Sequence, residues 1–131
     1  MTHGKKFFMI LLDSNIVIYL RDPKWGDRIA RRVADEGLST CNVVIAEVLG
    51  FKSLDKVDAR YFELLFAAMK NHPFNDMVTK KVIEIRKVHT IQLPDAIIAA
   101  TVLVNDLVLW THNIEDFGKI ADLRLFDPLE Q

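Results

Sequence analysis

The stretch Phe7-Phe8-Met9-Ile10-Leu11-Leu12-Asp13 decides the fold class of this chain. Its apolar residues run on without alternation over the length of a strand, which is typical of a strand buried on both faces of a parallel sheet. The run Leu107-Val108-Leu109-Trp110-Thr111 repeats this pattern far along the chain. Helical periodicity fills most of the sequence between the two runs. We therefore predict an α/β fold with helices on both faces of the sheet.

Turn and capping signals predict the other elements. We expect further strands at residues 38–41 and 123–126, an extended segment at 72–74, and Phe117 in a turn. Asn42 is a residue type that caps helices, and we expect it to cap the third one. The expected helices cover residues 15–20, 23–36, 43–51, 55–69, 76–89 and 95–104. Together these elements predict a three-layer α/β/α sandwich around a mostly parallel sheet.

Length and composition limit the possibilities. The 131 residues suit a single domain over 1–131, with residues 1–5 as a loose end. There are 17 Lys and Arg residues against 18 Asp and Glu residues, so a nucleic-acid partner requires local positive charge. Cys41 is the only cysteine, which excludes an internal disulfide and favours a reducing cytoplasm. No apolar run approaches the ~20 residues of a membrane span.

Four acidic residues stand where a parallel α/β sheet binds ligands, just beyond strand ends or on nearby helices. Asp13 ends the first strand, and Asp116 follows the strand that ends at Thr111. Glu47 and Asp95 have mainly apolar helical neighbours three and four positions away. Taken singly, each acid has an ordinary explanation as a cap, a loop acid or an edge residue. Glu47 is the most informative, because carboxylates are rare in apolar stripes.

Taken together, the four carboxylates predict a metal site. Several ionised acids cannot share one crevice without a counter-charge. Hard divalent cations supply that charge and prefer oxygen ligands, so Mg²⁺ or Mn²⁺ suits the site better than zinc. Such ions bridge a scissile phosphate, activate water and stabilise the leaving oxygen. The pattern favours metal-dependent hydrolysis of phosphodiester bonds.

Four motifs then resemble the PIN domain, and in particular the VapC-type toxins of toxin–antitoxin pairs. They occur in the order of that family and span nearly the whole chain. The motifs are Leu11-Leu12-Asp13-Ser14-Asn15, Ala46-Glu47-Val48-Leu49-Gly50, Pro94-Asp95-Ala96-Ile97-Ile98-Ala99-Ala100 and Thr111-His112-Asn113-Ile114-Glu115-Asp116-Phe117.

The resemblance implies an α/β/α sandwich with Mg²⁺- or Mn²⁺-dependent endoribonuclease activity. It also implies an RNA substrate such as tRNA or ribosomal RNA, a cognate antitoxin that silences the enzyme, and a homodimer. The metal-binding acids of the family match Asp13, Glu47 and Asp95, with Asp116 as the variable fourth. The supporting polar residues match Asn15, Thr111 and Asn113. His112 occupies a variable position, and we expect it to be exposed.

Basic and aromatic residues suggest where partners bind. Arg21 and Lys24 lie close in sequence to Asp13, and we predict that they grip RNA; neutralising both then flattens the salt dependence of binding. Trp110 lies in a strand pattern and is expected in the core. The helix over 55–69 has a wide apolar surface, which we expect to pack partly on a second copy or an antitoxin helix. That surface comprises Tyr61, Phe62, Leu65, Phe66 and Met69.

Three alternatives compete with the nuclease interpretation. A phosphoacceptor receiver domain needs adjacent acids after the first strand and a lysine after the last, but Ser14 follows Asp13 and Leu125-Phe126-Asp127 has no lysine. A phosphatase of the haloacid dehalogenase type needs a second Asp where Asn15 stands. The third alternative is a catalytically idle PIN-like binding module, which the complete acid set disfavours.

Overall fold

The computed structural model describes residues 9–130. Our expectations for residues 1–5, Phe7 and Phe8 lie outside the described residues. The strands are β1 (Ile10–Leu12), β2 (Leu38–Cys41), β3 (Lys70–His72), β4 (Val108–Trp110) and β5 (Leu125–Phe126). The helices are α1 (Ser14–Tyr19), α2 (Gly26–Val33), α3 (Asn42–Leu49), α4 (Lys56–Ala67), α5 (Asp76–Val88), α6 (Leu93–Val104) and α7 (Ile114–Phe117).

The five strands form one sheet in the order β3-β2-β1-β4-β5, and every neighbouring pair is parallel. The chain builds outward from β1 to β3, and then crosses back to place β4 on the other side of β1. The connections that leave β1 and β4 therefore diverge. In open α/β sheets, the carboxyl ends of strands at such a divergence are where ligands bind.

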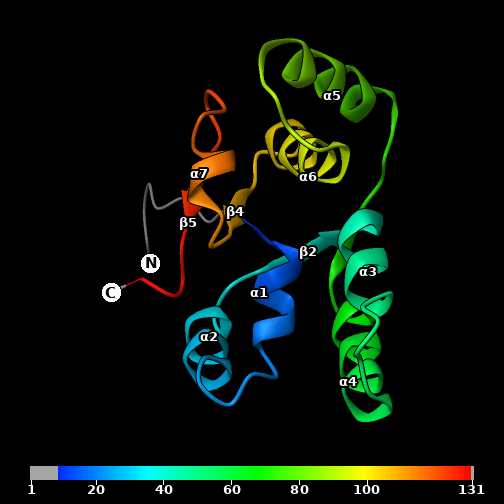
Figure 1. Ribbon diagram of the computed structural model, residues 1–131, viewed down its shortest axis with the longest axis vertical. Helices are drawn as coiled ribbons and strands as arrows, with labels where there is room; N and C mark the ends of the chain where they lie inside the picture. Colours follow the sequence, from blue (N-terminus) through cyan, green and yellow to red (C-terminus); the bar gives the residue numbers. More distant parts are fainter. Residues whose placement is uncertain (1–8, 131) are drawn as a thin grey trace, which may run out of the picture.

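Helices lie on both sides of this sheet, as predicted. In Figure 1, α5 and α6 lie on one side of β1 and β4, and α1 and α2 lie on the other. The helix α3 contacts β2, α1, α4 and α6, so it joins elements from both layers. This arrangement confirms the three-layer α/β/α fold expected from the sequence.

The core explains why the first apolar run has no alternation. Every residue of β1 is buried, because helices cover both of its faces. The helix α6 is buried continuously from Ala96 to Val102, since it packs against α5, α3 and β4. Trp110 is buried in the core, which confirms its predicted place. Phe117 lies in the short helix α7 and is fully buried, so the predicted turn at this residue was wrong.

The second helix begins later than Pro23, where we expected it. Asp22 Oδ1 accepts hydrogen bonds from the backbone N–H groups of Lys24 (2.8 Å) and Trp25 (3.3 Å). These bonds hold Pro23 in a turn, and α2 begins only at Gly26. An aspartate that bonds to the backbone just after it competes with helix formation.

Asn42 does not cap the third helix, so this prediction was wrong. It is the first residue of α3, and Cys41 occupies the capping position without a side-chain hydrogen bond. Asn42 Oδ1 instead accepts a hydrogen bond from Asn71 Nδ2 at 2.8 Å. The parallel pairing of Cys41 with His72 brings the two asparagines together, and only the assembled sheet creates that contact.

The long helix α4 buries part of the apolar surface that we expected to meet a partner. Phe62, Phe66 and Met69 belong to the core, with Phe62 only 1% exposed. Leu64, on another side of the same helix, is 56% exposed. The buried Phe62, Phe66 and Met69 therefore do not belong to the surface that a partner can contact. Tyr61 and Leu65 are half-buried. Among residues 9–130, no helix is both long and apolar enough to cross a membrane.

Candidate active site

Asp13 directly follows β1, beside the end of β4, and the fold fixes both of its carboxylate oxygens. Its backbone N–H donates to the carbonyl oxygen of Trp110 at 2.9 Å, which continues the β1–β4 pairing by one residue. Asp13 Oδ1 caps α1 by accepting from the N–H of Ser14 at 2.8 Å. Asp13 Oδ2 accepts from Thr111 Oγ1 at 2.7 Å. Thr111 directly follows β4 and is fully buried.

Glu47 approaches this carboxylate through a serine. Ser14 Oγ donates to Glu47 Oε1 at 2.5 Å, so one serine holds both acids through its backbone N–H and its hydroxyl. The sequence pattern overstated the burial of Glu47, because its side chain leaves α3 on an exposed side while Val44 and Val48 face the core. Ser14 was missed as a supporting residue, although its place directly after Asp13 is a signal that it shares the turn.

Asp116 joins Asp13 through a chain of polar contacts from the loop after β4. Thr111 Oγ1 accepts from the backbone N–H of Asn113 at 3.0 Å. Asn113 Nδ2 donates to Asp116 Oδ2 at 3.1 Å, and Asn113 also caps α7. The side chains of Thr111 and Asn113 thus contact the predicted acids. Asn15 lies in the first turn of α1, and its side chain is exposed to solvent.

The pKa of Asp95 is affected by the charges of the three other acids, so the four carboxylates interact electrostatically. It lies half-buried in the first turn of α6, where Pro94 helps to start the helix. Burial, followed by the charges of Asp13, Glu47 and Asp116, raises the pKa of Asp95 to about 6. Repulsion between like charges is the reason for the last three effects.

The pKa of Asp13 is raised in the same direction, and burial is again the main cause. Burial raises the pKa of its carboxyl group, and the nearby charge of Glu47 adds to the rise. Hydrogen bonds from Thr111 and Ser14 lower the pKa and oppose this change. Asp13 is therefore a buried acid whose ionised form depends on these two donors.

The donor set fits a hard divalent cation. The side chains of all four acids offer oxygen, which Mg²⁺ and Mn²⁺ prefer. Among the described residues, no three of these acids bring carboxylate oxygens within 4.8 Å of one another. Mg²⁺ tolerates this spacing, because it commonly binds one or two carboxylates directly and keeps several water molecules.

The predicted RNA-gripping residues have protein contacts of their own. Arg21 Nε pairs with Asp58 Oδ1 at 2.8 Å, and its guanidinium lies 4.7 Å from the centre of the Tyr61 ring. Lys24 Nζ lies 4.8 Å from the centre of the Trp25 ring. Their contact with RNA remains a prediction. His112 is exposed, as expected, and pairs with Asp127.

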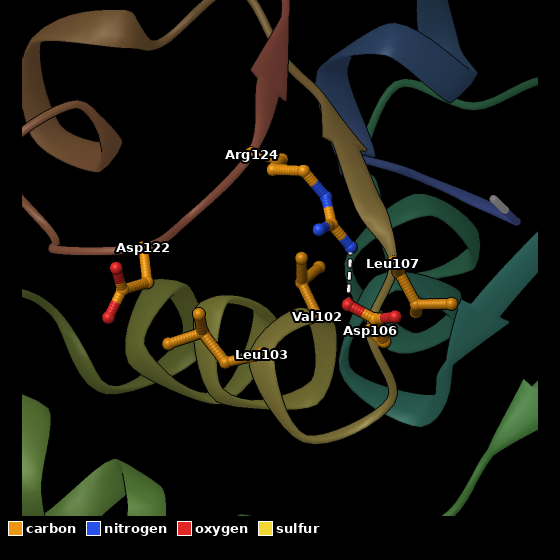
Figure 2. A pocket seen from close by; sticks show the side chains of 6 residues that line it. All are labelled: Val102, Leu103, Asp106, Leu107, Asp122 and Arg124. Carbon is orange, nitrogen blue, oxygen red and sulfur yellow. Dashed lines mark hydrogen bonds and ion pairs between the residues drawn. The ribbon is translucent and has the colours of Figure 1, made fainter. Parts of the chain in front are cut away.

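A hollow of about 210 Å³ lies at the opposite end of the sheet, beside the start of β4. Figure 2 shows Arg124 reaching across it to Asp106, with a hydrogen-bonded ion pair of 2.5 Å. Asp106 ends the turn after α6 with a positive φ of 54°, a conformation that aspartate tolerates better than most residues. This pair joins the α6 turn to the segment before β5, away from the four acids.

The sequence profile of the PIN domain family matches residues 10–123, a span that contains all four acids. The chain belongs to the PIN domain family. The receiver and phosphatase alternatives were therefore wrong. Membership supports a nuclease activity in general, and PIN nucleases generally use divalent metals. No relative was found among curated protein sequences.

Solved structures similar to this PIN domain come from bacterial toxin–antitoxin complexes. One is a chain of VapBC-1 from nontypeable Haemophilus influenzae, with 27% identity, a TM-score of 0.77, and coverage of 93% of this chain and 99% of that chain. A chain of DNA-bound VapBC from Salmonella typhimurium has 20% identity, a TM-score of 0.80, and the same two coverages. A chain of FitAcB from Neisseria gonorrhoeae has 24% identity, a TM-score of 0.74, and coverage of 92% and 98%.

Replacing Thr111 with valine tests how this PIN domain holds Asp13. Valine keeps the shape of the buried side chain but removes the hydroxyl that donates to Asp13 Oδ2 and accepts from Asn113. We expect the free energy of unfolding, measured with urea, to fall by about 1–3 kcal/mol, the usual penalty for stranding a buried polar group. Thr79→Val is the control, because the exposed Thr79 hydroxyl donates only to the carbonyl of Asn75. Equal losses in the two variants would contradict this role of Thr111.

Proposed function

We propose that this PIN domain is an Mg²⁺- or Mn²⁺-dependent endoribonuclease and the VapC-type toxin of a toxin–antitoxin pair. The observation that carries the proposal is the environment of Asp95, whose pKa is raised to about 6 partly by the charges of three other acids. A site with so much negative charge repels a polyanionic substrate unless a cation binds there. The proposed metal-binding residues are Asp13, Glu47, Asp95 and Asp116.

The chain's own residues supply positioning in this scheme. Thr111 and Ser14 fix the two oxygens of Asp13, and Ser14 also orients Glu47. Asn113 orients Asp116 from the loop after β4. When bound, a divalent ion supplies positive charge for the scissile phosphate and Lewis acidity for hydrolysis. Preorganised ligands of this kind need little rearrangement during the reaction.

A metal-removal experiment tests this function directly. Purified protein is incubated with an RNA and with a DNA of the same sequence, in Mg²⁺, in Mn²⁺ or in a chelator. We expect internal cleavage of the RNA with either ion, no cleavage in chelator, and recovery when excess Mg²⁺ is added back. Cleavage that persists in chelator would refute the metal dependence. Equal cleavage of the DNA would refute the assignment of RNA as the preferred substrate.

The proposed partner is an antitoxin. One similar structure, from Klebsiella pneumoniae, is described as a toxin–antitoxin complex, and VapBC2 from Rickettsia felis is described as bound to a DNA fragment from its promoter. We infer that a small neighbouring gene encodes the antitoxin of this chain. Its product is expected to copurify with the chain and to suppress RNA cleavage. A neighbouring product that neither binds nor inhibits would contradict the pairing and leave the nuclease proposal standing. The homodimer remains a prediction from the family resemblance.

A further inference from the structure

A second group of metal-binding side chains lies outside the four acids, at the rim of the sheet beyond β4 and β5. His112, Asp127 and Glu130 each offer one ligand atom, and these three atoms lie within 4.8 Å of one another. Among residues 9–130, this is the only group of three or more such side chains with that spacing. Unlike the four acids, it includes an imidazole nitrogen.

The fold brings these three residues together from two segments. The strands β4 and β5 are parallel, and Trp110 pairs with Phe126, so the residues that follow both strands leave the sheet side by side. Asp127 Oδ1 accepts from the N–H of Leu129 at 3.0 Å, and the N–H of Glu130 donates to the carbonyl of Asp127 at 3.3 Å. This tight turn returns Glu130 to the side of Asp127.

A contact from the second helix anchors the turn. Arg28 Nη2 donates to the backbone carbonyl of Glu130 at 3.0 Å. The side chain of Asp127 is only 8% exposed, whereas that of His112 is 53% exposed. One ligand of the group is thus fixed and shielded by the fold, and the imidazole remains accessible to an ion from solution.

The spacing suits a small tetrahedral ion. His112 Nδ1 and Asp127 Oδ2 are 2.8 Å apart and share a hydrogen bond. A tetrahedral zinc ion with bonds of about 2.0–2.2 Å holds its ligand atoms about 3.4 Å apart. An ion that replaces the shared proton therefore opens the His112–Asp127 pair slightly and draws Glu130 closer. The exposed side chains of His112 and Glu130 are free to make this adjustment.

We propose that His112, Asp127 and Glu130 form a second metal site that prefers a borderline ion such as Zn²⁺ to Mg²⁺. Imidazole suits Zn²⁺, whereas Mg²⁺ favours all-oxygen sites such as the four acids. Three protein ligands leave a fourth position for water, as in open zinc sites. This site does not rest on the proposed nuclease function.

The second site is connected to the four acids through the residues on either side of His112. His112 directly follows Thr111, whose hydroxyl holds Asp13, and directly precedes Asn113, which holds Asp116. An ion at His112 ties the loop that carries these contacts to the C-terminal turn. An ion bound at the second site therefore restrains the loop from which Asn113 holds Asp116.

Calorimetric titration with Zn²⁺ alone tests the site in the full chain. Because the four acids also attract cations, the titration is run in an Asp95→Asn background, which weakens the acidic site. We expect one Zn²⁺ to bind, and His112→Gln to weaken this binding by at least ~10–100-fold, since even outer-shell partners of metal ligands contribute that much. His89→Gln is the matched control, because His89 lies at the far end of α5, and it should leave the affinity unchanged.

Two further results separate this proposal from the proposed function. His112→Gln is expected to keep its Mg²⁺-dependent RNA cleavage, because His112 does not touch the four acids. A millimolar excess of Mg²⁺ is expected to leave Zn²⁺ bound at the second site. Absence of Zn²⁺ binding in the Asp95→Asn background, equal affinity in His112→Gln, or displacement by Mg²⁺ would each overturn the second site. None of these results bears on the nuclease proposal.

Discussion

Replacement of Asp95 with asparagine is expected to reduce metal-dependent RNA cleavage by at least about 100-fold, since direct metal ligands matter more than outer-shell partners, which contribute 10–100-fold. Asparagine keeps the size of the side chain but removes its charge. Cleavage is measured on a labelled RNA at fixed Mg²⁺, and folding is checked by circular dichroism. Full activity in a folded Asp95→Asn protein would refute the assignment of Asp95. Asp13→Asn is expected to cause a similar loss.

The same variant is expected to be more stable than the natural chain when metal is absent. The folded protein holds the pKa of Asp95 at about 6, above its ordinary value of 3.8, so folding favours the protonated form. The stability that Asp95 contributes therefore falls as the pH rises from about 4 to about 6, and the loss is complete above that range. After allowance for the solvent screening of a half-buried group, the penalty at pH 7.5 is about 1–2 kcal/mol.

Unfolding curves at pH 5 and pH 7.5 in chelator measure this penalty as the difference between the two proteins. We expect Asp95→Asn to gain stability relative to the natural chain at pH 7.5, and the gain to shrink at pH 5. Asp76→Asn is the matched control, because Asp76 lies in the first turn of α5 and has no place in the acidic site. It should lose about 0.3–1 kcal/mol, since an acid favours a helix start. Destabilisation of both variants would indicate that Asp95 serves only its helix.

Replacement of Phe62 with alanine is expected to lower the free energy of unfolding by about 3–5 kcal/mol, the usual cost of removing a buried aromatic side chain. Phe62 is 1% exposed, and its ring packs edge-on against Tyr61 at 5.5 Å between centroids. Such a loss is a large part of the stability of a small domain. Urea unfolding at a fixed pH measures it.

Leu64 supplies the control for this substitution. It lies on the same helix, two residues away, and is 56% exposed. Leu64→Ala is expected to change the stability by no more than about 0.5 kcal/mol, as is usual at exposed sites. Similar losses in the two variants would contradict the orientation of α4. This comparison also decides which side of α4 remains available to a partner.

Local sequence patterns determined the elements and the residues of interest. Continuous apolar runs predicted the buried strands β1 and β4. Such a run is recognised from consecutive residues alone, without knowledge of the contacts between distant segments. Carboxylates beyond strand ends or among apolar helical neighbours predicted Asp13, Glu47, Asp95 and Asp116 as a set. Motif order gave the PIN domain resemblance, which the family match confirms. Because these features depend on residues close together in the chain, they can be recognised from the sequence alone.

Tertiary structure decided what depends on contacts between distant segments. The pairing of β1 with β4 brings Thr111 to Asp13 across 98 positions of sequence, and the packing of α1 on α3 brings Ser14 to Glu47. The face that α4 buries was likewise set by its neighbours and not by its own periodicity. Side chains choose partners by distance in space, and residues far apart in the chain become neighbours only when the sheet and its helices assemble.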